Sequence, residues 1–281
     1  EPLGYLIENR RIRAALAEAV ARAGLDVRAP ASVAAVETDA GRATVVLGDG
    51  SRLSAPLVVG AEGRGSRVRA SAGIQTLGWG YGQSGVVATV GMDRDHGNVA
   101  HEYFLPDGPF AILPLTDRRA SLVWTESTRR AEALKAASDD AFHAHLMRRF
   151  GDFLGAVTVQ GPRFVYPLSL SLAEQLTAPR IALIGDAAHG VHPVAGQGLN
   201  MGLKDAAALA EVLIQAARNG EDIGAETVLD RYARWRRFDN TALAAGFDAF
   251  VRLFSNDIAP VRLARGLGLA AVNRIAPLRR A

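Results

Sequence analysis

Apolar residues recur along the chain at several spacings, and each spacing predicts a type of secondary structure. Between residues 8 and 23 an apolar residue stands at every third or fourth position and Gly24 follows, which predicts an amphipathic helix that ends at a glycine. Between residues 32 and 63, polar and apolar residues alternate around Ala-Gly and Asp-Gly turns. This alternation predicts short strands, and the last of them, in APLVVGAEG, is apolar enough to be buried.

The pattern changes in the middle of the chain. Four strand-like segments separated by Pro, Gly and Asp fill residues 84–125 and predict an antiparallel sheet, a second domain inserted into the first. The apolar run RIALIG predicts a further buried strand. Helical spacing predicts helices over residues 130–150, 199–218, 224–254 and 258–275. In the helix over 199–218, the register of Leu199, Leu203 and Leu213 predicts the buried face.

Composition narrows the function classes. The chain has 281 residues, which suits one large or two modest domains, and 49% apolar against 22% charged residues predicts a packed core. A net charge of +3 with scattered arginines indicates a solvated surface and no nucleic-acid partner. There is no cysteine, no apolar run of about 20 residues and no signal peptide, so we expect a cytoplasmic protein.

One segment carries most of the candidate chemistry: RIALIGDAAHGVHPVAGQGLNMGLKDAAALAEVL, residues 180–213. Asp186 follows the predicted strand, at the carboxyl end where ligands of open α/β sheets bind, and can accept hydrogen bonds from hydroxyl groups. Gly196 and Gly198 allow a ligand to approach the backbone, and the helix that follows favours negative charge at its start. A ligand with hydroxyls on one part and a reducible ring on another, such as a flavin, matches this arrangement.

Other interpretations of this segment remain open. Asp186 is also a candidate helix cap. His189 and His192 stand three residues apart with only Asp186 nearby as a third ligand, and this poor ligand set makes us expect no metal.

The segment GDAAH…P…GQGLNMGLKDA resembles the ribityl-binding motif of the class A flavoprotein aromatic hydroxylases, the para-hydroxybenzoate hydroxylase superfamily. The resemblance implies FAD as the cofactor, with Gly185 and Asp186 at the ribityl chain. It also implies that Pro193 lies beside the isoalloxazine. The residues implied to lie against the ring are Gly196, Gly198, Leu199 and Asn200.

A second segment, VVGAEGRGSRVR at residues 58–69, resembles the Asp-Gly motif of this superfamily, which serves flavin and pyridine nucleotide. Gly63, Ser66 and Arg69 match the motif. Glu62 departs from it, because Asp is usual there and Glu reaches one methylene further. The resemblance implies that Glu62 and Gly63 contact the cofactor. Asn9 matches the place of a flavin-contacting polar residue, with a helix cap as the alternative.

Residues 81–115, the segment LFSND and the arginine-rich end resemble the hydroxylases of ubiquinone biosynthesis, so that the likeness runs from about residue 4 to 280. It implies an α/β fold: an incomplete FAD-binding Rossmann-like domain, an inserted antiparallel β-sheet substrate domain and C-terminal helices. The implied boundaries are 1–76 and 169–222 for the FAD-binding domain, 77–168 for the substrate domain and 223–281 for the helical region.

The implied activity is an FAD-dependent monooxygenase. Electrons come from NADPH or NADH, and a flavin 4a-hydroperoxide hydroxylates the aromatic ring of a polyprenyl phenol. Pro193 and the backbone of Gly196 and Gly198 would shape the oxygen pocket, and the segments FAILPL and SLVWTE would roof the substrate. His192 is the candidate acid–base residue, with a structural role as the alternative. A monooxygenase for a soluble aromatic, a flavin reductase or halogenase, and a non-catalytic lipid-binding or complex-organising protein are the alternative functions.

The superfamily grips the FAD pyrophosphate with a G-x-G-x-x-G fingerprint at its first strand–helix joint, and this chain has no such joint. We therefore expect that the N-terminal strand and phosphate loop are missing, and that residues 1–281 alone bind FAD weakly and are inactive. The final helices combine apolar residues with arginines. They predict contact with anionic lipid on the inner membrane face, packing on the protein body, or docking of another biosynthetic protein.

Overall fold

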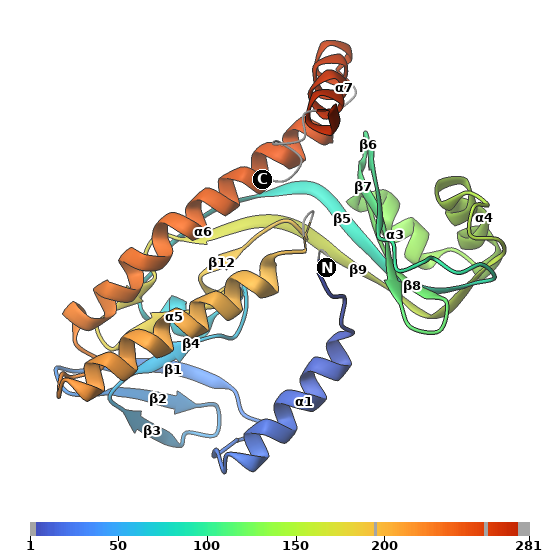
Figure 1. Cartoon of the computed structure of the whole chain (residues 1–281). Helices are drawn as coiled ribbons and strands as arrows, with labels where there is room; N and C mark the ends of the chain where they lie inside the picture. Colours follow the sequence, from blue (N-terminus) through green and yellow to red (C-terminus); the bar gives the residue numbers. More distant parts are fainter. Residues whose placement is uncertain (1–3, 194–195, 256–257, 275–281) are drawn as a thin grey trace. The chain divides into compact units, whose positions relative to one another are not determined.

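The computed structural model describes residues 4–193, 196–255 and 258–274, and the chain divides into two compact units (Figure 1). We call residues 28–81 with 169–249 the strand–helix unit, and residues 1–27 with 82–168 and 250–281 the sheet unit. Both units mix helices with antiparallel strands, so the predicted α/β fold with C-terminal helices is confirmed. The units are groups of residues in mutual contact, and the domain boundaries stay a prediction.

The strand–helix unit contains two small sheets and the helices that cover them. Its elements are β1 (Val33–Thr38), β2 (Ala43–Leu47), β3 (Arg52–Ala55), β4 (Val58–Gly60), α2 (Arg67–Ser71), β10 (Thr177–Ala178), β11 (Ile181–Leu183), the 3-10 turn η1 (Gly185–Ala187), β12 (His189–Gly190), α5 (Gly198–Arg218) and most of α6 (Glu226–Phe254). Strands β1, β2 and β3 form one antiparallel sheet, as the alternation and the turns predict.

The second sheet of this unit has the order β10–β11–β4, and β11 and β4 run parallel. Every residue of β11 is buried, which is usual for a parallel strand covered on both faces and confirms the predicted buried strand. Tyr232 on α6 donates a hydrogen bond to the carbonyl of Leu183 at 2.8 Å, which fixes α6 against the end of β11. The carboxyl ends of β4 and β11 therefore lie at one edge of the sheet.

Helix α5 forms over the predicted residues but buries a different face. Its buried side chains are Met201, Asp205, Ala208, Leu209, Val212 and Ala216. Leu199 and Leu203 are each 57% exposed, so the predicted buried face is wrong. The register is set by Asp205, which is fully buried because four hydrogen-bond donors surround its carboxylate.

The sheet unit is built on an antiparallel sheet with two helices on one face. Its elements are α1 (Asn9–Arg22), most of β5 (Thr76–Met92), β6 (His101–Leu105), β7 (Gly108–Leu115), β8 (Arg119–Ser127), α3 (Thr128–Ala136), α4 (Asp139–Phe150), most of β9 (Val157–Ala173) and α7 (Ala259–Arg274). Strands β5, β8, β7 and β6 pair in that order, which confirms the predicted antiparallel sheet.

Alternate residues of this sheet face opposite ways. Phe110, Leu122 and Trp124 are buried in a core with the side chains of α3 and α4. The single helix predicted over residues 130–150 is wrong, because the chain breaks at Ala137 and Ser138 into α3 and α4. Ser138 is the reason: its side chain accepts a hydrogen bond from the Ala141 N–H and starts a new helix.

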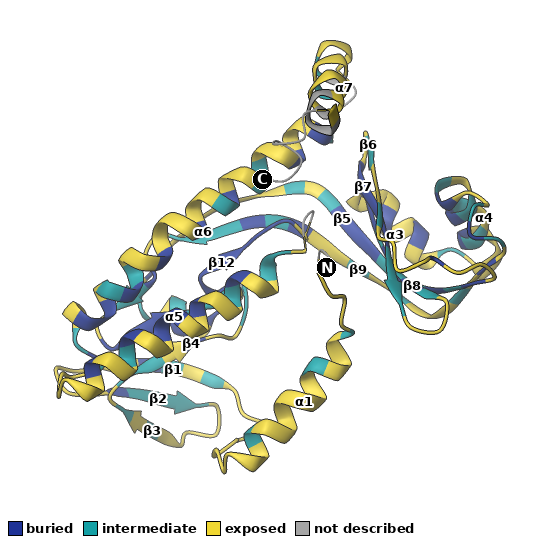
Figure 2. Cartoon of the chain, viewed as in Figure 1, coloured by how far each residue is buried: buried dark blue, intermediate teal, exposed yellow. Residues whose placement is uncertain are grey.

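Helices α1 and α7 form as predicted, and most of their described residues are exposed (Figure 2). Helix α1 buries none of its residues, so its predicted apolar face is not covered by the described parts of the unit. On α7, Leu263 is 67% and Leu267 is 65% exposed. Among the described residues no helix is both long and apolar enough to cross a membrane.

Glycines at 80, 82 and 85 match the spacing of a phosphate-binding fingerprint, but they lie within strand β5. No helix follows them, so they do not supply a helix N-terminus for a phosphate. The expectation that the chain contains no G-x-G-x-x-G is therefore wrong as to spacing, but these glycines lie in a strand and form no strand–helix joint.

Candidate functional site

Two turns far apart in the sequence meet at the edge of the β10–β11–β4 sheet. The parallel register pairs Ile181 with Val58 and Leu183 with Gly60, so the chain leaves both strands at the same edge. The Ile184 N–H donates to the carbonyl of Gly60 at 3.0 Å and extends the pairing by one residue. This brings the segment after β11, with Asp186, next to the segment after β4, with Glu62 and Gly63.

Arg64 ties the two turns together. Its Nε lies 3.3 Å from Asp186 Oδ2, its Nη1 donates to the carbonyl of Ser169 at 2.9 Å, and its Nη2 donates to the carbonyl of Val191 at 3.0 Å. The guanidinium also explains one glycine, because a Cβ on Gly190 would lie 2.7 Å from Arg64 Cζ. Arg64 stands inside the Asp-Gly segment, yet sequence reasoning did not single it out, since its partners lie more than 100 residues away.

Arg69 adds a second connection. Its Nη1 donates to the carbonyl of Ala187 at 2.7 Å and its Nη2 to the carbonyl of Arg64 at 2.6 Å. Ser66 caps α2 by accepting from the Arg69 N–H at 2.9 Å. Arg69, one of the matching residues of the second motif, thus holds the turn that contains Asp186.

Glu62 turns back onto its own helix. Its Oε1 accepts a hydrogen bond from the Val68 N–H at 2.7 Å, at the start of α2. The additional methylene, relative to Asp, provides the reach for this cap. Gly63 has a φ of +86°, so the turn needs a residue without a Cβ at that position. Contact of Glu62 and Gly63 with a cofactor stays a prediction.

The Asp186 carboxylate is open on one side. Its side chain is 46% exposed, and Arg64 is its ion-pair partner in the described part of the chain. The helix-cap alternative is wrong, because the N-cap of the 3-10 turn is Ile184 and no side chain caps it. Gly185 has a φ of +59°, which directs the chain sharply out of β11. The arrangement leaves a carboxylate oxygen available to hydroxyl groups.

The start of α5 offers backbone N–H groups. The N-cap residue, Gln197, makes no side-chain cap, and the first N–H groups of a helix have no partner within the helix. The helix is 21 residues long, and its dipole places positive charge at this end. Pro193, Gly196 and Leu199 are exposed here, while Val194 and Ala195 lie outside the described residues. Asn200 is exposed as well, and its Nδ2 donates to Gln197 Oε1 at 3.1 Å.

His192 is buried beneath this surface. It is 1% exposed, and its ring packs edge-on against Tyr81 with the centroids 5.2 Å apart. Burial and the positive charge of Arg64 lower the pKa of His192 to about 4. The imidazole is therefore neutral near pH 7. In the described part of the chain no three His, Asp or Glu side chains are grouped closely enough to hold a metal ion.

The remaining candidate lies elsewhere. Asn9 is exposed at the start of α1 in the sheet unit, and its N-cap neighbour Glu8 makes no side-chain cap. Its role toward a cofactor stays a prediction. Sequence reasoning missed Asp205, which accepts from the Gly185 N–H at 3.0 Å. The quoted segment GLKDA contains Asp205, but a single Asp in a helical pattern gives no sign in the sequence that it is buried.

The donors and acceptors at this edge fit FAD. The open carboxylate of Asp186 suits a polyol chain. The uncapped start of α5 suits the part of a flavin that becomes negative on reduction. Gly196 and Gly198 have room: a Cβ on Gly196 would meet no described atom within 4 Å, and one on Gly198 would meet only Val191 Cγ2 at 3.9 Å. The glycines leave space that the described residues do not fill.

Comparisons with known proteins show the family of the chain. The model of a family described as FAD binding domain matches residues 5–244. The chain is 51% identical over 280 residues to ubiquinone hydroxylase UbiL of Rhodospirillum rubrum, covering 99% of this chain and 65% of that protein. It is 39% identical over 279 residues to 3-demethoxyubiquinol 3-hydroxylase of Escherichia coli, covering 99% of this chain and 71% of that protein.

Solved structures show the same fold. The p-nitrophenol 4-monooxygenase PnpA of Pseudomonas putida superposes with a TM-score of 0.80 at 21% identity, covering 98% of this chain and 70% of that one. The anhydrotetracycline hydroxylase OxyS of Streptomyces rimosus gives 0.75 at 24% identity, covering 98% and 55%. The chain spans 65% of the R. rubrum relative, somewhat less than two thirds of its length. It belongs to the FAD binding domain family of flavoprotein hydroxylases, in the subgroup of the ubiquinone-biosynthesis hydroxylases.

Proposed function

We propose that the complete protein is an FAD-dependent monooxygenase that hydroxylates the aromatic ring of a polyprenyl phenol in ubiquinone biosynthesis. The observation that carries the proposal is the junction of the two turns through Arg64, beside the uncapped start of α5. This junction joins a carboxylate for hydroxyls to backbone N–H groups for an electron-poor ring. The relatives from R. rubrum and E. coli are named ubiquinone hydroxylase and 3-demethoxyubiquinol 3-hydroxylase, which supports the substrate class.

Each candidate residue has a proposed task at the cofactor. Asp186 accepts hydrogen bonds from the ribityl hydroxyls, and Gly185 turns the chain toward them. The residues that lie along the ring are Pro193, Gly196, Gly198, Leu199 and Asn200. Glu62, Gly63 and Asn9 contact more distant parts of FAD. When bound, FAD supplies electron transfer from NADPH or NADH and the activation of oxygen, and the protein positions it and excludes water.

His192 has a positioning task in this proposal. A proton-transfer residue works best with a pKa near the working pH, and the pKa of His192 lies well below it. Its ring is also buried against Tyr81, which in turn donates to Asp248 at 2.9 Å. We infer that His192 supports Pro193 from below, so that Pro193 keeps its place beside the ring.

The substrate task falls to the face of the sheet opposite α3 and α4. Residues that alternate with the buried core positions point to this face, among them Val87, Leu113 and Val123, and they are half-buried. They belong to the strands that contain FAILPL and SLVWTE. An apolar face of this kind suits a prenylated ring better than a small polar phenol.

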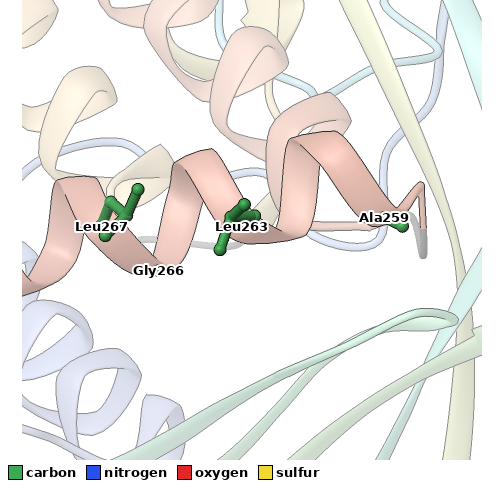
Figure 3. Close-up of a pocket in the computed structure, with 4 residues that line it drawn as sticks. All are labelled: Ala259, Leu263, Gly266 and Leu267. Carbon is green, nitrogen blue, oxygen red and sulfur yellow. The ribbon is translucent and has the colours of Figure 1, made fainter.

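A long hydrocarbon substrate needs access to lipid. Residues 258–281 contain five arginines and no acidic residue. Ala259, Leu263, Gly266 and Leu267 line a shallow apolar pocket of about 340 Å³ on α7 (Figure 3). We propose peripheral contact of this helix with anionic lipid, since exposed leucines that insert into a membrane surface and arginine charges at its headgroups reinforce each other. Docking of another biosynthetic protein is the alternative.

The test is an assay of the complete gene product. Purified protein should be yellow with bound FAD. It should consume oxygen and form a hydroxylated product, measured by mass spectrometry, with a prenylated phenol and an electron donor. Equal or faster turnover of an unprenylated phenol would reassign the enzyme to soluble aromatics. A colourless protein that takes up no added FAD would overturn the proposal and favour an accessory role.

A further inference from the structure

Asp205 connects the turn after β11 to two helices. Its carboxylate is fully buried on α5, in the second turn of that helix. Oδ2 accepts from the Gly185 N–H at 3.0 Å and from His189 Nε2. Oδ1 accepts from Arg236 Nε at 2.8 Å and from Asn240 Nδ2 at 3.1 Å, both on α6. One side chain therefore bridges the turn on one side and α6 on the other.

The bridge is charged and fully hydrogen-bonded. Burial alone would raise the pKa of Asp205, but the hydrogen bonds from His189, Arg236 and Asn240 outweigh it, and the pKa is lowered. Arg236 is 3% exposed, so the ion pair is shielded from water. Arg236 Nη2 also donates to Asn240 Oδ1 at 2.8 Å, which locks the two α6 residues together. The Asp205 carboxylate accepts four hydrogen bonds, from the turn and from α6, and so has little freedom to shift relative to either.

The position of the bridge is what links it to the cofactor site. Gly185 directly precedes Asp186, and Asp205 lies seven residues after the first residue of α5. The same helix approaches the turn closely, because a Cβ on Gly202 would lie 3.2 Å from Gly185 Cα. The bond from the Gly185 N–H thus fixes the distance between the Asp186 turn and the start of α5.

We propose that Asp205, held by Arg236, is a positioning residue for the FAD site. It sets the spacing at which Asp186 and the N–H groups of Gly198–Asn200 meet the two parts of the cofactor. The proposal rests on the proposed FAD site. It gives Asp205 no contact with FAD, and Arg64 and Arg69 hold the opposite side of the same turn.

The experiment uses Asp205→Asn in the complete gene product. Asn keeps the shape of the side chain but replaces one acceptor oxygen with an NH₂ donor. That NH₂ group must then face a donor from either the turn or α6, so hydrogen bonds on that side are lost. The FAD dissociation constant of the apoprotein, measured by flavin fluorescence, should rise at least tenfold. The visible circular dichroism of the saturated protein should change as well. Asp239→Asn is the matched control. It removes the other carboxylate of Arg236, at 2.9 Å from Nη1, without touching the turn, and should leave FAD affinity within twofold.

The outcomes separate positioning from stability. If Asp205 only stabilised the fold, Asp205→Asn would lower the melting temperature yet bind FAD with wild-type affinity and dichroism well below that temperature, and this would overturn the proposal. Should Asp205→Asn fail to fold, Arg236→Lys keeps the charge but not the bond geometry, and should weaken FAD binding about threefold. Unchanged affinity in that variant would also overturn it. A wild-type protein that binds no FAD would contradict the proposed function instead.

Discussion

Gly198 and Gly246 are both helical glycines with room for a methyl group, and only one of them lies at the candidate site. A Cβ on Gly198 would make an ordinary contact of 3.9 Å with Val191, and a Cβ on Gly246 would meet no described atom within 4 Å. Neither glycine has a positive φ. The packing of the described residues thus gives no reason for glycine at position 198, and the proposed reason is the close approach of FAD.

The expected effect of Gly198→Ala has opposite signs for folding and for binding. Alanine in place of glycine stabilises a helix interior by about 0.5–1 kcal/mol, and we expect the lower value at the first residue of α5. A methyl group between the backbone and the ring would lengthen or remove a hydrogen bond to a group that carries charge. Such a bond contributes about 1.5–3 kcal/mol. Its loss corresponds to a rise of about 10- to 100-fold in the FAD dissociation constant.

Flavin fluorescence titration and thermal unfolding of the complete protein measure the two effects separately. Gly246→Ala is the control: it should raise stability by about 0.5–1 kcal/mol and leave FAD affinity unchanged. Gly202→Ala should lower both, because its Cβ would press on Gly185 Cα at 3.2 Å. A Gly198→Ala protein that binds FAD as tightly as the wild type would refute the reasoning that this glycine makes room for the ring.

Four further predictions follow from the geometry. Arg64→Met removes the donors to two carbonyls and a half-exposed ion pair, so it should lower the free energy of unfolding by about 2 kcal/mol. In thermal unfolding this corresponds to a loss of about 4–8 °C. Arg42→Met, at an exposed site, is the control and should have little effect. The pKa of His192 is about 4 in the folded protein and 6.5 in the unfolded protein. Between pH 4 and pH 6.5 the unfolded protein therefore binds more protons than the folded protein. Stability in urea should therefore be complete above pH 6.5 and fall by about 2 kcal/mol at pH 5, a loss absent from His192→Gln. Leu263→Asp should reduce co-sedimentation with anionic vesicles relative to Leu25→Asp, an equally exposed leucine on another segment, and equal binding would contradict lipid contact through α7. Residues 1–281 expressed alone should not retain FAD through gel filtration, and a stoichiometric flavin spectrum in the protein peak would contradict the expectation that they bind FAD weakly.

Local sequence signals were enough for most of the elements and for the family. Strand β11 reads as a buried strand because four consecutive apolar residues precede a glycine turn, and in the structure it runs parallel to β4. The break between α3 and α4 was also present in the sequence, as a Ser followed by two Asp residues. Helical periodicity on both sides concealed it. A cap signal should have outweighed the periodicity there.

The partners of the site residues could not be read in the same way. Arg64 and its carbonyl acceptors are 105 and 127 residues apart. Every residue has a backbone carbonyl, so the residue type does not reveal which carbonyl accepts the bond. Helix α5 shows the second limit. Apolar spacing favoured a face with Leu199 and Leu203, but the protein buries the face of Asp205 and exposes those leucines. A satisfied buried charge can set the register of a helix, and periodicity counts only apolar residues.

Distant backbone acceptors and a buried charge both act on the same segment, the turn after β11. The turn from Gly185 to Val191 is held by Arg64 and Arg69 on one side and by Asp205 on the other. The family motifs name the residues that would touch FAD, yet the bonds that fix their positions are to backbone atoms or to a buried side chain. A cofactor site must be rigid before the cofactor arrives if binding energy is not to be lost in ordering it. It follows that variants of Arg64, Arg69 or Asp205 should both weaken FAD binding and alter the spectrum of the bound flavin. Loss of the Asp186 carboxylate alone should weaken binding too, but with a smaller change in the spectrum of the flavin that remains bound.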